Sequence, residues 1–377
     1  MTYPWEDPEI AKHYNPKQIE ILLNQPKLLD QYFVENPFDT TGLNEIDIWR
    51  NQVNIGFEYL RDVLKISKPI DSFKDQIKIS SSSIKSFDGY EIPIKIYKLK
   101  GSDKNSLHVN YHGGGFSLGG GLNFDENYIP WLVYLTGVTI IDVDYRLIPE
   151  NHYTVAFLDG FASIKYIIEH SDEYQIDKER ISIGGASAGG HLVLALGHLL
   201  RDFNLKVKFI LANVPPAENY TNHETVDTII LNESFKKFEN SPDHSYATIK
   251  KFRKYFVQSE VDNPNQIIDN LDNIKKYFGR LEFLKDLQKY YQGDTYLSPN
   301  FEGLVPHVII TGENDTFSSS GLGYAKKLID NFIPVQSKTI RGLGHGWLWQ
   351  TNQFEEAWEG LQYIAKLIRD VDNNEFF

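Results

Sequence analysis

The chain has 377 residues, of which 41% are hydrophobic, and it carries a formal net charge of −13 and no cysteine. This length and apolar content exclude a disordered chain and indicate about two domains, or one domain with an elaborate insertion. The acidic surface disfavours nucleic acid and anionic lipid as partners, and the lack of cysteine excludes disulfides, thiolate metal sites and a cysteine nucleophile. The N-terminus lacks a signal-peptide pattern and no apolar run approaches membrane-spanning length, so we expect a cytoplasmic protein without membrane insertion.

Residues 1–75 are the first predicted segment. Apolar positions such as Ile19, Leu22 and Leu23 recur at helical spacing among many charges. We expect an N-terminal helical segment that contributes to a cap, and we find no catalytic pattern in it.

Strand-like and helix-like runs alternate from residue 76 onward. Strands are predicted at 76–84, 90–99, 107–112, 137–145, 181–185, 207–214, 307–315 and 335–342, and helices at 154–170, 191–203, 323–332 and 354–371. The alternation predicts an α/β domain over 76–215 and 298–377, with a mostly parallel twisted sheet flanked by helices. Residues 216–297 interrupt it with a segment rich in helix, aromatic and charged residues, which we interpret as a helical cap insertion.

Ser187 lies at the centre of GASAG, residues 185–189, between a predicted strand and a predicted helix. Small residues keep a turn narrow, whereas a single hydroxyl at its apex adds nothing to packing. The pattern Gly-x-Ser-x-Gly between strand and helix is typical of a nucleophile elbow, and the helix directs its N-terminal amides toward developing negative charge. We therefore interpret Ser187 as a nucleophile.

A serine hydroxyl needs a neighbouring base, and that base needs an acidic group to orient it. Asp315 follows one late predicted strand and His345 follows the next, which gives the order Ser, Asp, His expected for this type of fold. Glu313 in the same loop is the competing acid, and we favour Asp315.

A glycine-rich loop, HGGG at residues 112–115, follows the predicted strand LHVNY. Acyl transfer builds negative charge on a carbonyl oxygen, and a loop free of side chains allows backbone N–H groups to converge on it. Ala188, the residue after the nucleophile, is expected to supply a further N–H group. No Lys-Ser/Thr pair closes the loop, so it does not match a phosphate-binding loop.

These motifs together closely resemble the hormone-sensitive-lipase branch of the α/β-hydrolases, from about residue 106 to 365. The motifs are HGGG (112–115), DYRLIPE (144–150), GASAGG (185–190), SP (298–299), GEND (312–315) and GLGHGW (342–347). The resemblance implies an α/β-hydrolase fold with a helical cap. It implies a catalytic triad of Ser187, Asp315 and His345. It also implies an oxyanion hole formed by the amides of Gly114, Gly115 and Ala188, with Gly113 as a less favoured donor.

The resemblance has further implications and some departures. It implies a structural charge network around the HGGG loop, formed by Asp144, Arg146 and Glu150. The family's usual Asp or Thr in the elbow is Ala186 here, its proline after the catalytic acid is Thr316, and its proline near the start of the helix after PE is Thr154. These departures concern the substrate subgroup rather than the chemistry.

The function predicted from these residues is that of a serine carboxylesterase, which hydrolyses short- to medium-chain carboxylic esters through an acyl-serine intermediate. The alternatives are a non-catalytic small-molecule-binding homologue, as in the plant gibberellin receptors that have lost the histidine, and a serine peptidase. We expect a small-molecule ester as substrate, no nucleic acid partner and no cofactor. The oligomeric state stays open, with a homodimer among the options.

Two groups of side chains have alternative interpretations. His108 and His112 have a metal-ligand spacing, but no third ligand or HExxH pattern accompanies them, so we expect no metal. The aromatic residues of the insertion either line a pocket or form the core of the cap itself. They include Phe235, Phe238, Tyr246, Phe252, Tyr255, Phe256, Tyr277 and Phe278.

Overall fold

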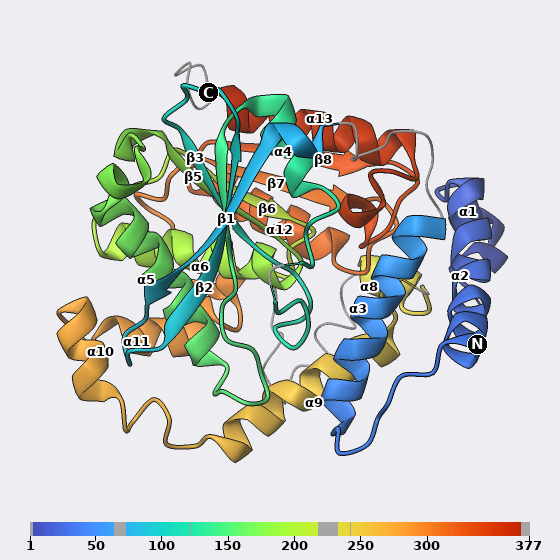
Figure 1. Cartoon of the computed structure of the whole chain (residues 1–377), viewed down its shortest axis with the longest axis horizontal. Coiled ribbons are helices and arrows are strands. Elements are labelled where there is room, and N and C mark those ends of the chain that lie inside the picture. Colours follow the sequence, from blue (N-terminus) through green and yellow to red (C-terminus); the bar gives the residue numbers. More distant parts are fainter. Residues whose placement is uncertain (1–2, 64–72, 122, 218–232, 242, 371–377) are drawn as a thin grey trace.

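An eight-stranded sheet with strand order β1-β2-β4-β3-β5-β6-β7-β8 forms the centre of the molecule (Figure 1). The computed structural model describes residues 3–63, 73–121, 123–217, 233–241 and 243–370. Strand β2 pairs antiparallel with β1 and β4, and all other neighbours in the sheet are parallel. The predicted mostly parallel α/β sheet is thereby confirmed.

The strands and helices have the following bounds. The strands are β1 Ile77–Lys85, β2 Glu91–Leu99, β3 Leu107–Tyr111, β4 Thr139–Val143, β5 Ile181–Ala186, β6 Ile210–Asn213, β7 His307–Gly312 and β8 Val335–Ile340. The helices are α1 Pro8–Ala11, α2 Pro16–Glu35, α3 Glu45–Val63, α4 Ile129–Thr136, α5 Thr154–Glu169, α6 Ala188–Asp202, α8 Glu233–Phe238, α9 Tyr246–Asp262, α10 Leu271–Phe278, α11 Phe283–Asp286, α12 Ser318–Asp330 and α13 Glu355–Asp370.

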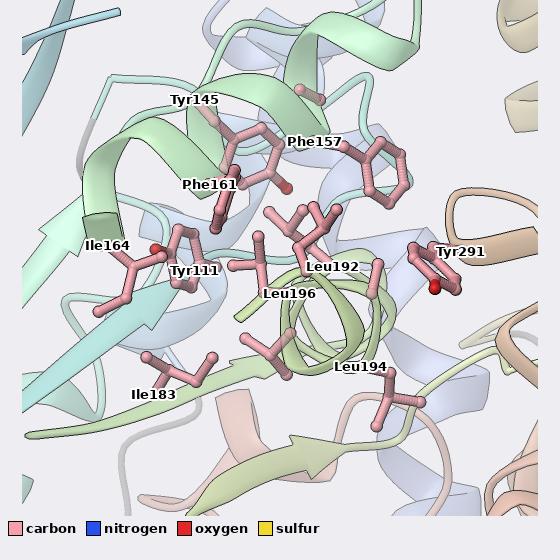
Figure 2. Close-up of a cluster of buried hydrophobic side chains, with 14 of the residues drawn as sticks. Tyr111, Tyr145, Phe157, Phe161, Ile164, Ile183, Leu192, Leu194, Leu196 and Tyr291 are labelled. Carbon is pink, nitrogen blue, oxygen red and sulfur yellow. The ribbon is translucent and has the colours of Figure 1, made fainter. Parts of the chain in front are cut away.

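Helices cover both faces of the sheet, and each face has its own hydrophobic cluster. Every residue of β3, β4 and β5 is buried, as expected for parallel strands between two helical layers. On one face, Leu192 and Leu196 of α6 lie among Phe157 and Phe161 of α5 (Figure 2). The other cluster includes residues of α4 and α13, where the rings of Trp131 and Trp358 meet edge to face. These layers hold the carboxyl ends of the parallel strands in fixed positions.

The N-terminal helices lie at one side of the molecule, beside α8 and α9 (Figure 1). Trp49 of α3 packs on Phe252 of α9 with ring centroids 5.0 Å apart, and Lys254 pairs with Glu45 at 2.7 Å. Within the described residues, no helix combines the length and apolar content that a membrane span requires.

Candidate active site

Ser187 occupies a strained turn between β5 and α6. Its backbone has φ 56° and ψ −118°, a left-handed conformation that L-residues rarely adopt and that costs about 1–3 kcal/mol. The turn is held by a hydrogen bond from the Ser187 N–H to the Asn213 carbonyl at 2.9 Å. Gly189 is required because a Cβ there would lie 1.9 Å from the carbonyl oxygen of Tyr111. The tight packing therefore presents the Ser187 hydroxyl at the end of the strand.

The structure brings Ser187, Asp315 and His345 together. His345 Nε2 lies 2.8 Å from Ser187 Oγ, and His345 Nδ1 lies 2.9 Å from Asp315 Oδ1. Because a carboxylate only accepts hydrogen bonds, the ring proton belongs on Nδ1, which leaves Nε2 to accept from the serine hydroxyl. The three side chains are buried, and Asp315 is fully so. This arrangement can move the serine proton onto the imidazole.

The surroundings of His345 favour its charged form. Burial alone would lower the pKa of His345, but the charge of Asp315, its hydrogen bond and the charge of Asp243 together raise that pKa above the usual 6.5. A histidine of raised basicity accepts the serine proton more readily.

Glu313, the competing acid, binds other groups. Its Oε2 accepts a hydrogen bond from the N–H of Gly342 at 2.8 Å, and its Oε1 lies 2.8 Å from His13 Nδ1. Glu313 therefore links the N-terminal segment to the histidine loop, and Asp315 alone of the two bonds to His345.

The glycine-rich loop after β3 lies beside the elbow. Gly114 and Gly115 both have positive φ, 107° and 58°, so the loop turns in a way that side chains would oppose. Within the part of the chain that the structure describes, the N–H groups of Gly114, Gly115 and Ala188 donate no hydrogen bond. The ring of Phe252 lies on Gly115, where a Cβ would come within 2.2 Å of it. These amides are thus available to a developing oxyanion.

Asp144, Arg146 and Glu150 bind other groups rather than one another. Asp144 accepts hydrogen bonds from the N–H of Gly121 at 3.1 Å and so holds the far end of the glycine-rich stretch. Arg146 bonds bidentately to Asp159, which is fully buried, and also pairs with Asp88.

Glu150 pairs with Arg50 of α3, a residue without a sequence signal. Arg50 also donates from Nε to the Ser117 carbonyl at 2.7 Å and from Nη2 to the Ile148 carbonyl at 2.9 Å. It therefore connects the N-terminal helices to the glycine-rich loop. Asp243 and His244, between α8 and α9, carry no sequence signal either, yet they lie against His345 and its loop.

A cavity of about 640 Å³ lies between the N-terminal helices and the segments that follow β3 and β8. Trp49 and Gln52 of α3 line it, and it reaches the site at Asp243, Gly346 and Trp349, although Ser187 itself is not in the lining. No Lys, Arg or His is among its described lining residues. None of the eight aromatic residues named for the insertion lines it; Phe235, Phe252 and Phe256, for example, belong to the main hydrophobic cluster.

The two histidines with metal-ligand spacing have other partners. His108 Nδ1 bonds to Ser182 Oγ at 2.9 Å, and His112 Nδ1 bonds to the Gly113 carbonyl at 2.7 Å. Among the described residues, no group of three or more His, Asp or Glu side chains could hold a metal ion.

Several known proteins similar to this chain are esterases. The chain is 27% identical over 287 residues to the arylesterase of Saccharolobus solfataricus. The matched region covers 75% of this chain and 81% of that protein. It is 24% identical over 298 residues to the carboxylesterase NlhH of Mycobacterium tuberculosis, with 78% and 82% covered. A solved esterase structure from Pyrobaculum calidifontis superposes on this chain with a TM-score of 0.71 and 21% sequence identity. The superposition covers 95% of this chain and 99% of the esterase chain, so the two proteins share a fold.

The family model for the alpha/beta hydrolase fold matches residues 108–349. That range is more than half of the chain and contains the glycine-rich loop, the elbow and both loops that carry the acid and the histidine. The chain therefore belongs to the α/β-hydrolase family, in the hormone-sensitive-lipase branch that its motifs resemble.

Proposed function

We propose that this protein is a serine carboxylesterase that works through an acyl-serine intermediate. The observation that carries the proposal is the continuous hydrogen-bonded series from Ser187 Oγ through His345 to Asp315. Beside it lie the backbone amides of Gly114, Gly115 and Ala188, which donate to no group among the described residues. The similarity to an arylesterase and a carboxylesterase supports the reaction class.

Acylation begins when His345 Nε2 accepts the proton of Ser187 as Oγ attacks the ester carbonyl. The carbonyl π electrons move to its oxygen, and the N–H groups of Gly114, Gly115 and Ala188 stabilise that oxyanion. Asp315 stabilises the imidazolium without taking its proton.

The tetrahedral intermediate then collapses, the bond to the alcohol oxygen breaks, and the imidazolium gives its proton to the leaving alcohol. Water repeats the sequence on the acyl-serine: His345 takes a proton from water, hydroxide attacks, and the carboxylic acid leaves as Ser187 regains its proton.

We further propose that residues 1–75 and 216–297 act together as a cap over the 76–215 and 298–377 catalytic domain. The contact between Trp49 and Phe252 and the ion pair between Glu45 and Lys254 support this, because each joins the two parts of the cap. The substrates we propose are short- to medium-chain esters without an anionic group, since the described cavity lining contains Asp30, Glu58 and Asp243 but no Lys, Arg or His.

A non-catalytic homologue that only binds small molecules is disfavoured, because His345 is present and hydrogen-bonded to both Ser187 and Asp315. Among the described residues of the site, no feature favours a peptidase. The cytoplasmic location and the homodimer stay predictions.

Hydrolysis of p-nitrophenyl acetate and butyrate tests the proposal, with Ser187→Ala as the blank. We expect saturable turnover by the wild-type protein and at least about a 10³-fold lower kcat in the variant. Equal rates for the two proteins would overturn the proposed function.

A further inference from the structure

The imidazole of His244 stacks on the imidazole of His345. The ring centroids are 4.2 Å apart, the planes are inclined by 26°, and both side chains are buried. Burial, with the neighbouring charge of His345 as a second cause, holds the pKa of His244 well below its usual 6.5, so the ring is neutral. His244 lies between α8 and α9, whereas His345 follows β8, so the cap covers one face of the catalytic ring.

His244 also reaches the catalytic acid through Thr316. Its Nδ1 lies 3.1 Å from Thr316 Oγ1, and that hydroxyl donates to Asp315 Oδ1 at 3.5 Å. With its proton on Nδ1, His244 donates to the threonine, whose own proton then points to the carboxylate. Proline, which usually follows the acid in the similar family, has no hydroxyl and could not form this link.

Asp243 contacts the other side of the histidine loop. One carboxylate oxygen accepts from Ser241 Oγ, which in turn accepts from the Tyr14 hydroxyl. Burial raises the pKa of Asp243, while Ser241, the charge of His345 and the backbone of Gly346 oppose that rise. The Oδ2 atom is buried without a hydrogen-bond partner among the described residues, and a Cβ on Gly344 would come within 2.1 Å of it. The carboxylate is thus held against the residues on either side of His345.

We propose that Asp243 and His244 are positioning residues for His345, supplied by the cap rather than by the catalytic sheet. By stacking, His244 fixes the plane of the His345 ring. Through Thr316 it also fixes the orientation of the Asp315 carboxylate. Asp243 holds the turn around His345 and places a second negative charge near the imidazolium that forms during acylation. The triad is then complete only while the cap is seated. This inference rests on the proposed function, because the role requires His345 to act as a general base.

The pH profile separates this role from a merely structural one. The titratable groups facing His345 are Asp315 from the loop after β7 and Asp243 and His244 from the cap segment. Tyr14 lies behind Ser241, and burial raises its pKa far above neutral pH. Because the carboxylate of Asp243 favours protonated His345, Asp243→Asn lowers the basicity of His345. We expect the acidic limb of kcat/KM to move to lower pH by roughly 0.5–1 unit and kcat to fall on the plateau.

A double-mutant cycle tests the link through Thr316. Thr316→Val removes the hydroxyl at nearly constant volume, and His244→Phe keeps a stacked ring but loses the donor. Each change should lower kcat by about 2- to 10-fold with KM little changed, and the double variant should be no slower than the slower single one. Independent, multiplying effects, or no effect of either change, would show that the link does not serve catalysis.

Ser245→Ala is the matched control for loosening the cap. Ser245 caps α9 by accepting from the Thr248 N–H at 3.3 Å and is next to His244 in the chain. It should lower Tm without moving the acidic limb.

Titration of the His345 ring by NMR in the wild-type protein and in Asp243→Asn repeats the pH test without turnover. An unchanged midpoint in Asp243→Asn overturns the role of Asp243. If the wild-type protein hydrolyses no ester, the proposed function fails, while the NMR midpoint still decides whether Asp243 acts on His345.

Discussion

Asp315 and Glu313 lie two residues apart in the loop after β7, and they bind groups from different parts of the molecule. Asp315 bonds to the ring of His345, whereas Glu313 accepts from the Gly342 N–H and meets His13 of the N-terminal segment. Asp315 therefore orients the catalytic base His345, whereas Glu313 stabilises the loop that carries His345.

Exchanging each acid for its amide should reveal this division. We predict that Asp315→Asn lowers kcat by about 10⁴-fold, because the amide favours the wrong tautomer of His345. Glu313→Gln should lower kcat by less than about tenfold, since the amide oxygen still accepts from Gly342. Steady-state kinetics on p-nitrophenyl butyrate measures both, and the reverse ranking would make Glu313 the catalytic acid.

The pH dependence of the reaction should report the raised pKa of His345. The base works when it is neutral, so kcat/KM falls as the pH drops through this pKa, and the midpoint should lie above the usual 6.5. The measurement is kcat/KM from pH 4.5 to 9 at constant ionic strength. A midpoint well below 6.5 would mean that desolvation outweighs the charges of Asp315 and Asp243.

Arg146 is expected to matter for stability rather than for catalysis. It compensates the charge of Asp159, whose pKa burial raises even though the Arg146 contacts lower it. Arg146→Met should lower the free energy of unfolding by about 3–5 kcal/mol, because it leaves a carboxylate buried without its partner.

Urea unfolding followed by circular dichroism measures this cost. Lys326→Met, which breaks the exposed pair of Lys326 with Asp330, is the matched control and should not change stability measurably. Equal midpoints for the two variants would show that the buried pair contributes nothing.

Chain length should limit the acyl group. Each buried methylene contributes about 0.8 kcal/mol, roughly fourfold in kcat/KM, until the chain meets the wall of the site. Overpacking then costs roughly 1–3 kcal/mol. We therefore expect kcat/KM to rise with acyl length and then to fall, so that acetyl to hexanoyl esters are preferred over long-chain esters. The ring of Phe252 on Gly115 supports a closely covered site.

The measurement is kcat/KM for p-nitrophenyl esters from acetate to palmitate, with and without emulsified lipid. A maximum at palmitate, or a jump in rate when the emulsion forms, would identify a true lipase instead.

Much of the catalytic domain could be predicted because its signals are local and periodic. The strands between 107 and 213 are short apolar runs bounded by turn residues, and the order of Ser187, Asp315 and His345 follows the order of strands in this fold. Helix α4 is absent from the predicted elements, since its eight residues IPWLVYLT are apolar up to the final Thr136 and carry no helical period.

The contacts between distant segments could not be predicted. Arg50 is one charged residue of an amphipathic helix, and nothing near it in the chain indicates that it meets the Ser117 carbonyl. The stack of His244 on His345 likewise depends on how the cap packs, which local periodicity does not encode. Of the charge network expected around the HGGG loop, Asp144 contacts the glycine-rich stretch directly and Glu150 reaches it through Arg50. Arg146 instead binds Asp159 and Asp88, which its position in the chain does not indicate.

Covalent labelling of Ser187 tests the central claim most directly. An organophosphorus or sulfonyl fluoride reagent should react stoichiometrically with the native protein, because labelling requires an activated hydroxyl. Peptide mass mapping should place the adduct on residues 181–200 and at Ser187, and the Ser187→Ala variant should fold normally and remain unlabelled. A native protein that carries no adduct in that peptide, or one in which Ser187→Ala is labelled equally well, would contradict the assignment of Ser187 as the nucleophile.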